Sequence, residues 1–307
     1  MLRQHIFTLL ISSLLITSAL AQTQNQPIKI AFIGDTGAGD GFQAVLNLIK
    51  QEAVDLTVVT GDTSYDAKLD AQWDHMVRST LPNDAALIAA GNHDYDDSDI
   101  DTVLNLGQQR LRQQQNVRCL GDYGENMTCT IHNVHLVFSS IGTKGFDFLQ
   151  NRQLKENLSK APNDHWRICV WHKNQRAMQV GSKRNEVGWE AYEACREHGA
   201  FIATGHEHSY SRTHLLSDMS EQTIADSSDH FHLTEGTSFT FVSGLGGREV
   251  RDQDRGGNWW ASIYTQDQDA QYGALFAVFH PDHAEFYFKN IKGEIIDQFT
   301  AEKGYWP

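Results

Sequence analysis

Five short apolar runs in the sequence each end just before a residue that can bind a metal ion. The runs are 28–33, 55–60, 85–90, 167–171 and 200–204, and the residues that follow them include Asp35, Asp62, Asn92, His172, His206 and His208. Carboxylate and amide oxygens and imidazole nitrogens are ligands for divalent and trivalent cations. One aspartate after a glycine is usually a turn residue, and one histidine is usually a surface or core residue. Five such positions in register predict a metal centre.

Parallel β-strands are the elements that would bring these side chains together. A short β-branched run ended by glycine is typical of a parallel strand, and the carboxyl ends of such strands face the ligand crevice of an α/β sheet. Asp62 and Tyr65 follow one strand end closely enough to share a site. His206 and His208 are two residues apart, which in an extended segment places both rings on one face.

The rest of the chain predicts the layers around these strands. Apolar residues at helical spacing predict helices at 41–53, 70–81, 99–115, 147–160 and 187–198, with the helix at 99–115 on the solvent side. A hairpin is expected at 128–141. From residue 237 onward the pattern changes to strands without helices, at 237–242, 273–280, 284–289 and 294–300. A βα half followed by an antiparallel half predicts an α/β fold, a four-layer α/β/β/α sandwich of two packed mixed sheets.

The first 21 residues have the pattern of a secretory signal peptide. Arg3 precedes an apolar stretch from residue 6 to 20, and Ala19-Leu20-Ala21 forms a small-residue cleavage pattern. Nothing later is apolar for long enough to cross a bilayer. We therefore expect cleavage after Ala21, a secreted or periplasmic protein, and no membrane association after cleavage.

The mature chain is expected to form one domain with a small-molecule partner. Residues 22–307, about 286 in number, lack a Pro- or Gly-rich linker and internal repeats, which favours a single domain. The formal charge of −14 argues against nucleic acid or an anionic membrane as a partner. A phosphate ester would have to be attracted by local metal charge. The oligomeric state stays open.

Four cysteines leave room for disulfides in an exported chain. Cys119 and Cys129 flank a turn-rich segment and could close a surface loop. Cys169 lies in a predicted strand and Cys195 in a predicted helix, so each is as compatible with a buried thiol as with half of a bridge. None has zinc-site spacing.

At five positions the sequence resembles the calcineurin-like metallophosphoesterases, and most closely the purple (tartrate-resistant type) acid phosphatases. The matching blocks are Gly-Asp-x-Gly at 34–37, Gly-Asp-x-x-Tyr at 61–65, Gly-Asn-His-Asp at 91–94, His172, and Gly-His-x-His at 205–208. The resemblance implies two metal ions bridged by Asp62. One would be held by Asp35, Asp62, Tyr65 and His208, and the other by Asp62, Asn92, His172 and His206.

The resemblance also implies which metals are bound. Most of the superfamily has histidine where Gly37 stands here, so Tyr65 is expected to supply the missing ligand. A phenol with a pKa near 10 ligates as phenolate only beside a strongly charged cation, which favours Fe³⁺. The other site, with one shared anion and neutral ligands, suits divalent Fe, Zn or Mn.

The expected function is that of an exported phosphomonoesterase. The resemblance implies a metal-bound hydroxide as nucleophile, with His93 assisting the leaving oxygen. Lys173 and Arg176 could bind a second charged group of the substrate, or form a solvated basic turn. A phosphodiesterase or nucleotidase on the same scaffold is therefore the alternative. A non-enzymatic secreted metal-binding protein is a further alternative, which the complete ligand set disfavours.

Overall fold

The computed structural model describes residues 26–304. The expected signal peptide, residues 1–21, lies outside the described residues, so its prediction stands untested. Within residues 26–304, no helix combines the length and the apolar character needed to cross a membrane.

Two mixed sheets form the centre of the molecule. The seven-stranded sheet has the order β12 (His230–Leu233), β17 (Ile295–Lys303), β16 (His283–Asn290), β15 (Gly273–Phe279), β1 (Ile28–Ile33), β2 (Leu56–Val59), β3 (Leu87–Ile88). The eight-stranded sheet has the order β14 (Trp260–Tyr264), β9 (Tyr210–Thr213), β13 (Thr240–Ser243), β8 (Phe201–Thr204), β7 (Trp166–Val170), β6 (Val134–Ser139), β5 (Asn126–Ile131), β4 (Arg118–Asp122). A small ladder joins β10 (Leu215–Asp218) to β11 (Thr223–Asp226).

Strand direction follows the two halves of the sequence. The pairs β1–β2 and β2–β3 are parallel, as are β6–β7, β7–β8 and β8–β13. The late strands β15, β16 and β17 form an antiparallel meander, and β15 joins β1 antiparallel. Parallel strands therefore lie side by side within each sheet, and their carboxyl ends meet at one edge.

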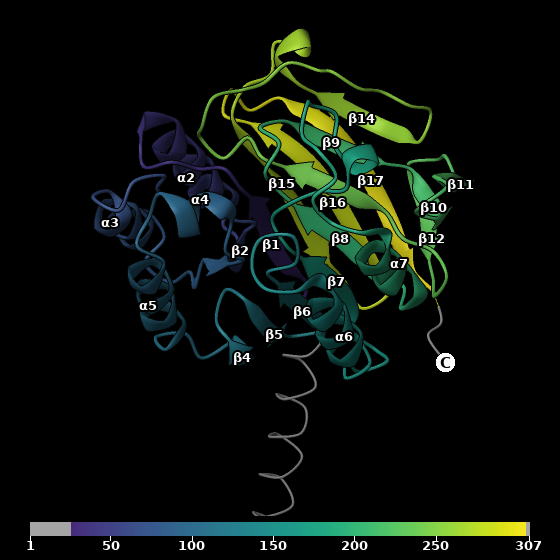
Figure 1. Ribbon diagram of the computed structural model, residues 1–307, viewed down its shortest axis with the longest axis horizontal. Helices are drawn as coiled ribbons and strands as arrows, with labels where there is room; N and C mark the ends of the chain where they lie inside the picture. Colours follow the sequence, from purple (N-terminus) through teal and green to yellow (C-terminus); the bar gives the residue numbers. More distant parts are fainter. Residues whose placement is uncertain (1–25, 305–307) are drawn as a thin grey trace, which may run out of the picture.

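Helices cover the outer faces of both sheets, as Figure 1 shows. On one side, α2 (Asp40–Glu52) contacts β15 and α5 (Ile100–Leu111) contacts β3, with α3 (Asp70–Thr80) and the short α4 (Asn92–Asp96) packed beside them. On the other side, α6 (Asp147–Leu158) contacts β5 and β6, and α7 (Trp189–Glu197) contacts β8. Two short 3₁₀ turns, Arg176–Met178 and Gln266–Gln268, complete the elements. The predicted α/β/β/α sandwich is confirmed.

Aromatic rings fill the space between the two sheets. Phe32 of β1 meets Phe241 of β13 edge to face, and Phe201 of β8 meets Phe286 of β16 in the same way. Each ring is fully buried. Within β7, Ile168 belongs to this inner core, while its neighbour Cys169 belongs to the cluster that includes residues of α6 and α7. Burial on both faces explains why these strands have continuous apolar sequences.

The structure contains strands that the sequence pattern did not reveal. They are the short β4, β9, β10, β11, β12 and β14. β9, for example, reads Tyr-Ser-Arg-Thr and is nevertheless buried throughout. Its Arg212 bonds Asp297 of β17 at 2.7 and 2.9 Å, and Tyr210 donates to the same carboxylate at 2.6 Å. A buried charge is tolerated when it is paired in this way, although Arg212 Nη1 has no hydrogen-bond partner within residues 26–304. Because Ser211, Arg212 and Thr213 are polar, apolar periodicity could not predict the strand.

The four cysteines form two disulfides. Cys119 bonds Cys129 across the paired strands β4 and β5, the loop closure that the sequence left possible. Cys169 bonds Cys195, which resolves the alternatives that the sequence left open. The second bridge ties β7, the strand that leads to His172, to α7 on the outer face.

Glu52, at the end of α2, should contribute pH-dependent stability. Its carboxylate bonds Lys29 at 2.5 Å, Lys289 at 2.7 Å and Tyr287 at 2.6 Å. Burial opposes ionisation, but these bonds prevail and lower the pKa of Glu52 from 4.5 to about 2. A lowered folded-state pKa stabilises the fold above pH 4.5, and this contribution is lost as the pH falls toward 2.

We therefore expect Glu52→Gln to lower the free energy of unfolding by about 1–2 kcal/mol at pH 7, because partial solvent exposure weakens the pairs. The difference in the free energy of unfolding between this variant and the unmodified protein should shrink as the pH falls from 4.5 to 2. Denaturant titrations of both proteins at several pH values measure this difference. Glu156→Gln, in an exposed pair with Arg152, is the control and should cost less than about 0.5 kcal/mol. A Glu52→Gln difference that does not depend on pH would contradict the assignment.

Candidate metal centre

The predicted ligands converge where the carboxyl ends of the strands from both sheets meet. Asp35 follows β1, Asp62 follows β2, and His206 follows β8 of the other sheet. The loops bond one another directly: Asp35 N donates to Gly61 O at 3.0 Å, and His206 N donates to Asp35 Oδ2 at 2.9 Å. The two sheets are therefore joined at the site itself.

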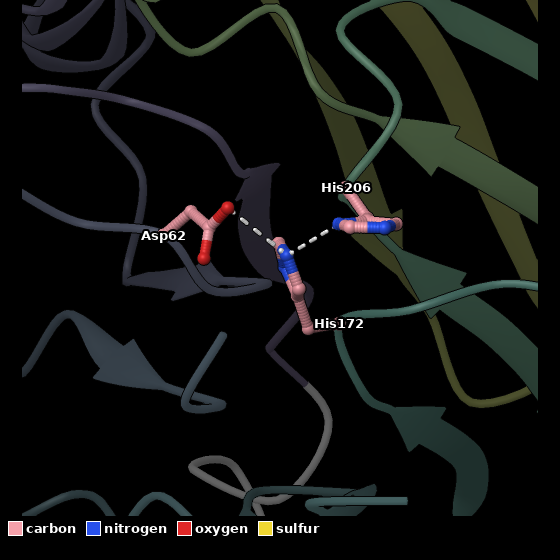
Figure 2. Close-up of side chains that lie close together, drawn as sticks. All are labelled: Asp62, His172 and His206. Carbon is pink, nitrogen blue, oxygen red and sulfur yellow. Dashed lines mark hydrogen bonds and ion pairs between the residues drawn. The ribbon is translucent and has the colours of Figure 1, made fainter. Parts of the chain in front are cut away.

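Asp62, His172 and His206 form one buried donor cluster, shown in Figure 2. Asp62 Oδ2 lies 3.1 Å from His172 Nε2, and that nitrogen lies 3.1 Å from His206 Nδ1. One ligand atom from each residue falls within 4.8 Å of the other two. All three side chains are buried, and their donor atoms face one another. This arrangement can hold a metal ion.

Asn92, the first residue of α4, stands between two residues that approach the Asp62 carboxylate. It follows Gly91, whose Cα faces the Asp62 carboxylate. Asn92 Oδ1 is buried and has no hydrogen-bond partner among residues 26–304. A buried amide oxygen without a donor is costly, and a cation would satisfy it.

Asp35, Tyr65 and His208 form a second group of donors. The Tyr65 hydroxyl lies 3.3 Å from Asp35 Oδ1 and 3.3 Å from His208 Nε2, and these two atoms are 3.4 Å apart. Burial, together with the charges of Asp35 and Asp62, raises the pKa of the Tyr65 hydroxyl above its ordinary value. This group is richer in oxygen than the first, which suits a harder ion.

Each of the predicted histidine ligands, His172, His206 and His208, has one ring nitrogen that is hydrogen-bonded to an acceptor outside the two donor groups. A hydrogen bond of this kind fixes the tautomer and leaves the other nitrogen free to bind metal. The outer contacts are His172 Nδ1 to Thr60 O at 2.7 Å, His206 Nε2 to Glu186 Oε2 at 2.7 Å, and His208 Nδ1 to Glu249 O at 2.9 Å. The inner nitrogens are the ones that face the two donor groups.

His206 and His208 point into different groups of donors. His206 has φ of 70°, so the segment bends and is not extended as expected. Its Nδ1 reaches His172, whereas His208 Nε2 reaches Asp35. One short motif thereby supplies a nitrogen to each group.

Backbone conformation is unusual at the site. Four non-glycine residues there have left-handed φ: Asp35 (56°), Asp62 (57°), Tyr65 (60°) and His206 (70°). Such residues cost on the order of 1–3 kcal/mol each and concentrate at functional sites. Two glycines of the site are also required, because a Cβ at Gly61 would collide with the His172 ring and one at Gly91 with the Asp62 carboxylate.

Asp94 is a structural carboxylate that sequence reasoning did not assign. It is buried and accepts Gly91 N at 2.8 Å, Asp62 N at 3.0 Å, and Thr63 N at 2.9 Å. It therefore ties the loop after β2 to the loop after β3. In the sequence, only its position at the end of the Gly-Asn-His-Asp block indicated a role for Asp94 at the site.

His93 faces the site without joining either group of donors. Its backbone N donates to Asp62 Oδ1 at 2.8 Å, its Nε2 lies 4.0 Å from Asp62 Oδ2, and its ring packs on Tyr65 at 4.5 Å. Its Nδ1 bonds Asp97. The sequence analysis did not assign Asp97, although residues four apart in a helix, such as His93 and Asp97, face each other. The pair orients His93 Nε2 toward the donor groups.

Lys173 and Arg176 have different surroundings. The Lys173 ammonium lies 3.1 Å from Glu186 Oε1, whose other oxygen bonds His206. Burial opposes ionisation of Glu186, but these contacts lower its pKa to about 2. Lys173 thus supports a predicted ligand. Arg176 lines a cavity of about 390 Å³ beside the site.

Comparison with known proteins identifies the family. A family model described as calcineurin-like phosphoesterase matches residues 28–210. A purple acid phosphatase from yellow lupin (Lupinus luteus) seeds has a similar fold, with a TM-score of 0.70 and 16% identity, covering 92% of this chain and 55% of the lupin chain. This chain thus spans about half of that enzyme.

Two further solved structures share the fold. One is the anchor protein of the inner membrane complex of Plasmodium, with a TM-score of 0.60 and 14% identity, covering 92% of this chain and 90% of that chain. The other is a dimetal phosphatase from Danio rerio, with a TM-score of 0.55 and 10% identity, covering 89% and 98%. A search of curated proteins gives no match. At these identities the solved structures establish the fold alone. The family model, in contrast, spans more than half of the sequence. The chain therefore belongs to the calcineurin-like phosphoesterase family, whose members are metal-dependent phosphoester hydrolases.

Proposed function

We propose that this protein is an exported binuclear-metal phosphatase of the purple acid type that hydrolyses phosphomonoesters. The observation that carries the proposal is the pair of neighbouring donor groups, one containing Asp62 and the other Asp35, which are linked by the bond from His206 N to Asp35 Oδ2. One group contains Tyr65 and the other contains the unpartnered Asn92 oxygen. The family supplies the coarser conclusion, a metal-dependent hydrolase of phosphate esters.

Asp62 is the proposed shared ligand. Asp35, Tyr65 and His208 would complete one site, and Asn92, His172 and His206 would complete the other. The first set, with three anionic oxygens, suits Fe³⁺, and the second suits divalent Fe, Zn or Mn. Two such ions would polarise the phosphoryl oxygens and lower the pKa of a water.

The residues around the ligands have supporting roles. Glu186 and Thr60 hold His206 and His172 so that the inner nitrogens face Asp62. His93, oriented by Asp97, is placed to donate a proton from Nε2 to the leaving oxygen of the ester. Asp62 and His172 are almost fully buried, so their contacts with a bound ion would be little weakened by bulk solvent.

Export through cleavage after Ala21 remains part of the proposal. The two disulfides support it, because such bonds persist in oxidising compartments outside the cytosol. The lupin purple acid phosphatase, a structural neighbour, supports the purple type.

A phosphodiesterase or nucleotidase is the second candidate, and the cavity beside Arg176 favours it. Hydrolysis rates of the metal-loaded protein on a monoester, a diester and pyrophosphate would separate these activities. A non-enzymatic role is less well supported, since every predicted ligand position holds a donor residue.

The Tyr65 ligand gives a direct test of the purple type. A phenolate on Fe³⁺ absorbs visible light, so aerobically purified, iron-replete protein should be purple, and Tyr65→Phe should lose the band. Tyr95→Phe is the matched control, because its hydroxyl bonds Glu125 at 2.7 Å outside the donor groups, and it should keep the band. A colourless unmodified protein with full iron content, or an unchanged spectrum in Tyr65→Phe, would remove the purple assignment and leave the family assignment standing.

A further inference from the structure

A cavity of about 390 Å³ is lined in part by the loop that follows His172, and we name it the leaving-group cavity. The residues that matter in its lining are Arg176, Gln179, Asn185, Arg255, Trp259 and Trp260. They come from two loops that are about 80 residues apart in the sequence, one after β7 and one before β14. None of these residues belongs to the predicted ligand set.

The first loop starts and ends at the metal centre. It begins at His172 and reaches Glu186, whose carboxylate bonds His206 at 2.7 Å. Asn185, the residue before Glu186, lines the cavity and accepts Arg176 N at 3.0 Å. The cavity is therefore bounded by the same loop that holds the Asp62–His172–His206 cluster. The cavity thus shares a loop with the cluster at which the proposed function places the phosphoryl group.

Two positive charges face the cavity without acidic partners. Arg255 donates to the backbone oxygens of Gly181 and Ser182, and the Arg176 side chain is exposed. Neither guanidinium forms an ion pair with a residue of the described chain, 26–304. Burial and the nearby charge of Arg176 lower the pKa of Arg255. In a protein with a formal charge of −14, this local positive charge predicts a bound anion.

Aromatic rings and unpaired polar atoms complete the lining. Trp259 and Trp260 have ring centroids 6.4 Å apart, and Trp259 is fixed by a hydrogen bond from its Nε1 to Ala177 O at 3.1 Å. Trp260 Nε1 and Gln179 Oε1 are buried and have no partner within residues 26–304. One is a donor and the other an acceptor. Apolar walls with a few convergent polar groups are typical of a small-molecule site.

We propose that the leaving-group cavity binds the leaving group of the substrate, and that this group combines a flat heterocycle with a second anionic group. A nucleoside diphosphate has this chemistry, with its terminal phosphoryl group at the metal centre, its second phosphate at the arginines and its base at the tryptophans. The inference rests on the proposed phosphatase function and takes its nucleotidase form, because the terminal bond of a nucleoside diphosphate is a phosphoanhydride. In the reaction, water forms the new bond to the terminal phosphorus, the bond to the bridging oxygen breaks, and the products are orthophosphate and a nucleoside monophosphate.

The test compares four substrates that carry the ring, the second phosphate, both or neither. They are ADP, AMP, methyl diphosphate and methyl phosphate, each assayed for kcat/KM with the metal-loaded protein. ADP should be the best substrate. Arg176→Ala should reduce kcat/KM by about 10- to 100-fold on the two diphosphates, because a charge-assisted contact is lost, and by less than about threefold on the two monophosphates.

Trp259→Leu should act on the other half of the substrate. It should reduce kcat/KM for ADP and AMP more than for the two methyl compounds, because only the nucleotides have a ring to stack. Arg184→Ala is the control for net charge, since Arg184 is exposed on the same loop and does not line the cavity. Arg184→Ala should change kcat/KM for all four substrates by the same small factor. Equal losses on all four substrates with Arg176→Ala, or no preference for ADP, would overturn the proposal.

A binding measurement separates this inference from the proposed function. AMP, the product of ADP hydrolysis, should quench tryptophan fluorescence saturably in the metal-loaded protein, and Arg176→Ala with Trp259→Leu should abolish the quenching. Saturable AMP binding without hydrolysis of any ester would support the cavity and reject the phosphatase. Hydrolysis of methyl phosphate without AMP binding or a preference for ADP would support the phosphatase and reject the cavity.

Discussion

Asp62→Asn should leave a folded protein that binds fewer than two metal ions per chain and hydrolyses phosphate esters more than about 100-fold more slowly. The substitution keeps an oxygen that can accept His93 N, now at 2.8 Å, so the loop after β2 retains that contact. It removes the negative charge that would hold two cations together. Loss of residues outside the ligand shell already costs about 10- to 100-fold in such sites, so loss of a shared ligand should cost more.

Metal stoichiometry, kcat and thermal stability measured on the same preparation would check this result. Asp66→Asn is the control, because Asp66 lies on the same loop and its side chain, within residues 26–304, bonds only Lys68 N, at 2.9 Å. It should keep both metals and full activity. If Asp62→Asn retains two ions and most of its activity, Asp62 is not the shared ligand.

His93→Ala should lower kcat by roughly 10²- to 10⁴-fold on an alkyl phosphate, the range of a positioned general acid, while metal content stays at two ions. The loss should be much smaller on an activated aryl ester, because its leaving group needs no proton. Asp97→Asn should give a weaker effect in the same direction, since Asp97 only orients the ring through Nδ1.

The comparison between the two esters is the decisive measurement for His93. His75→Ala, at an exposed position on α3, serves as the control and should change neither rate. Equal losses of His93→Ala on both esters would show that His93 acts through charge or loop structure and not as a proton donor. A loss of metal would instead show that the residue supports the ligands.

The positions of the predicted ligands could be read from local sequence. A parallel strand buried on both faces needs a continuous apolar run, and the chain must turn at its carboxyl end, so a polar residue just after the run lies at the sheet edge. Asp35, Asp62 and His172 were found in this way, and the structure brings them into neighbouring donor groups. The sandwich architecture followed from the same runs, together with the change of pattern near residue 237.

Only the tertiary structure decided which distant residues support these positions. Arg212 can be buried in strand β9 because Asp297, 85 positions away in the sequence, forms an ion pair with it. Glu186 acquires its role only when the loop after β7 folds back onto His206, and the cavity beside it appears only when the loop before β14 brings Arg255 to Arg176. Local periodicity reports burial on one face of one element, whereas ion pairs, ligand orientation and cavities depend on segments that meet only after the two sheets pack together.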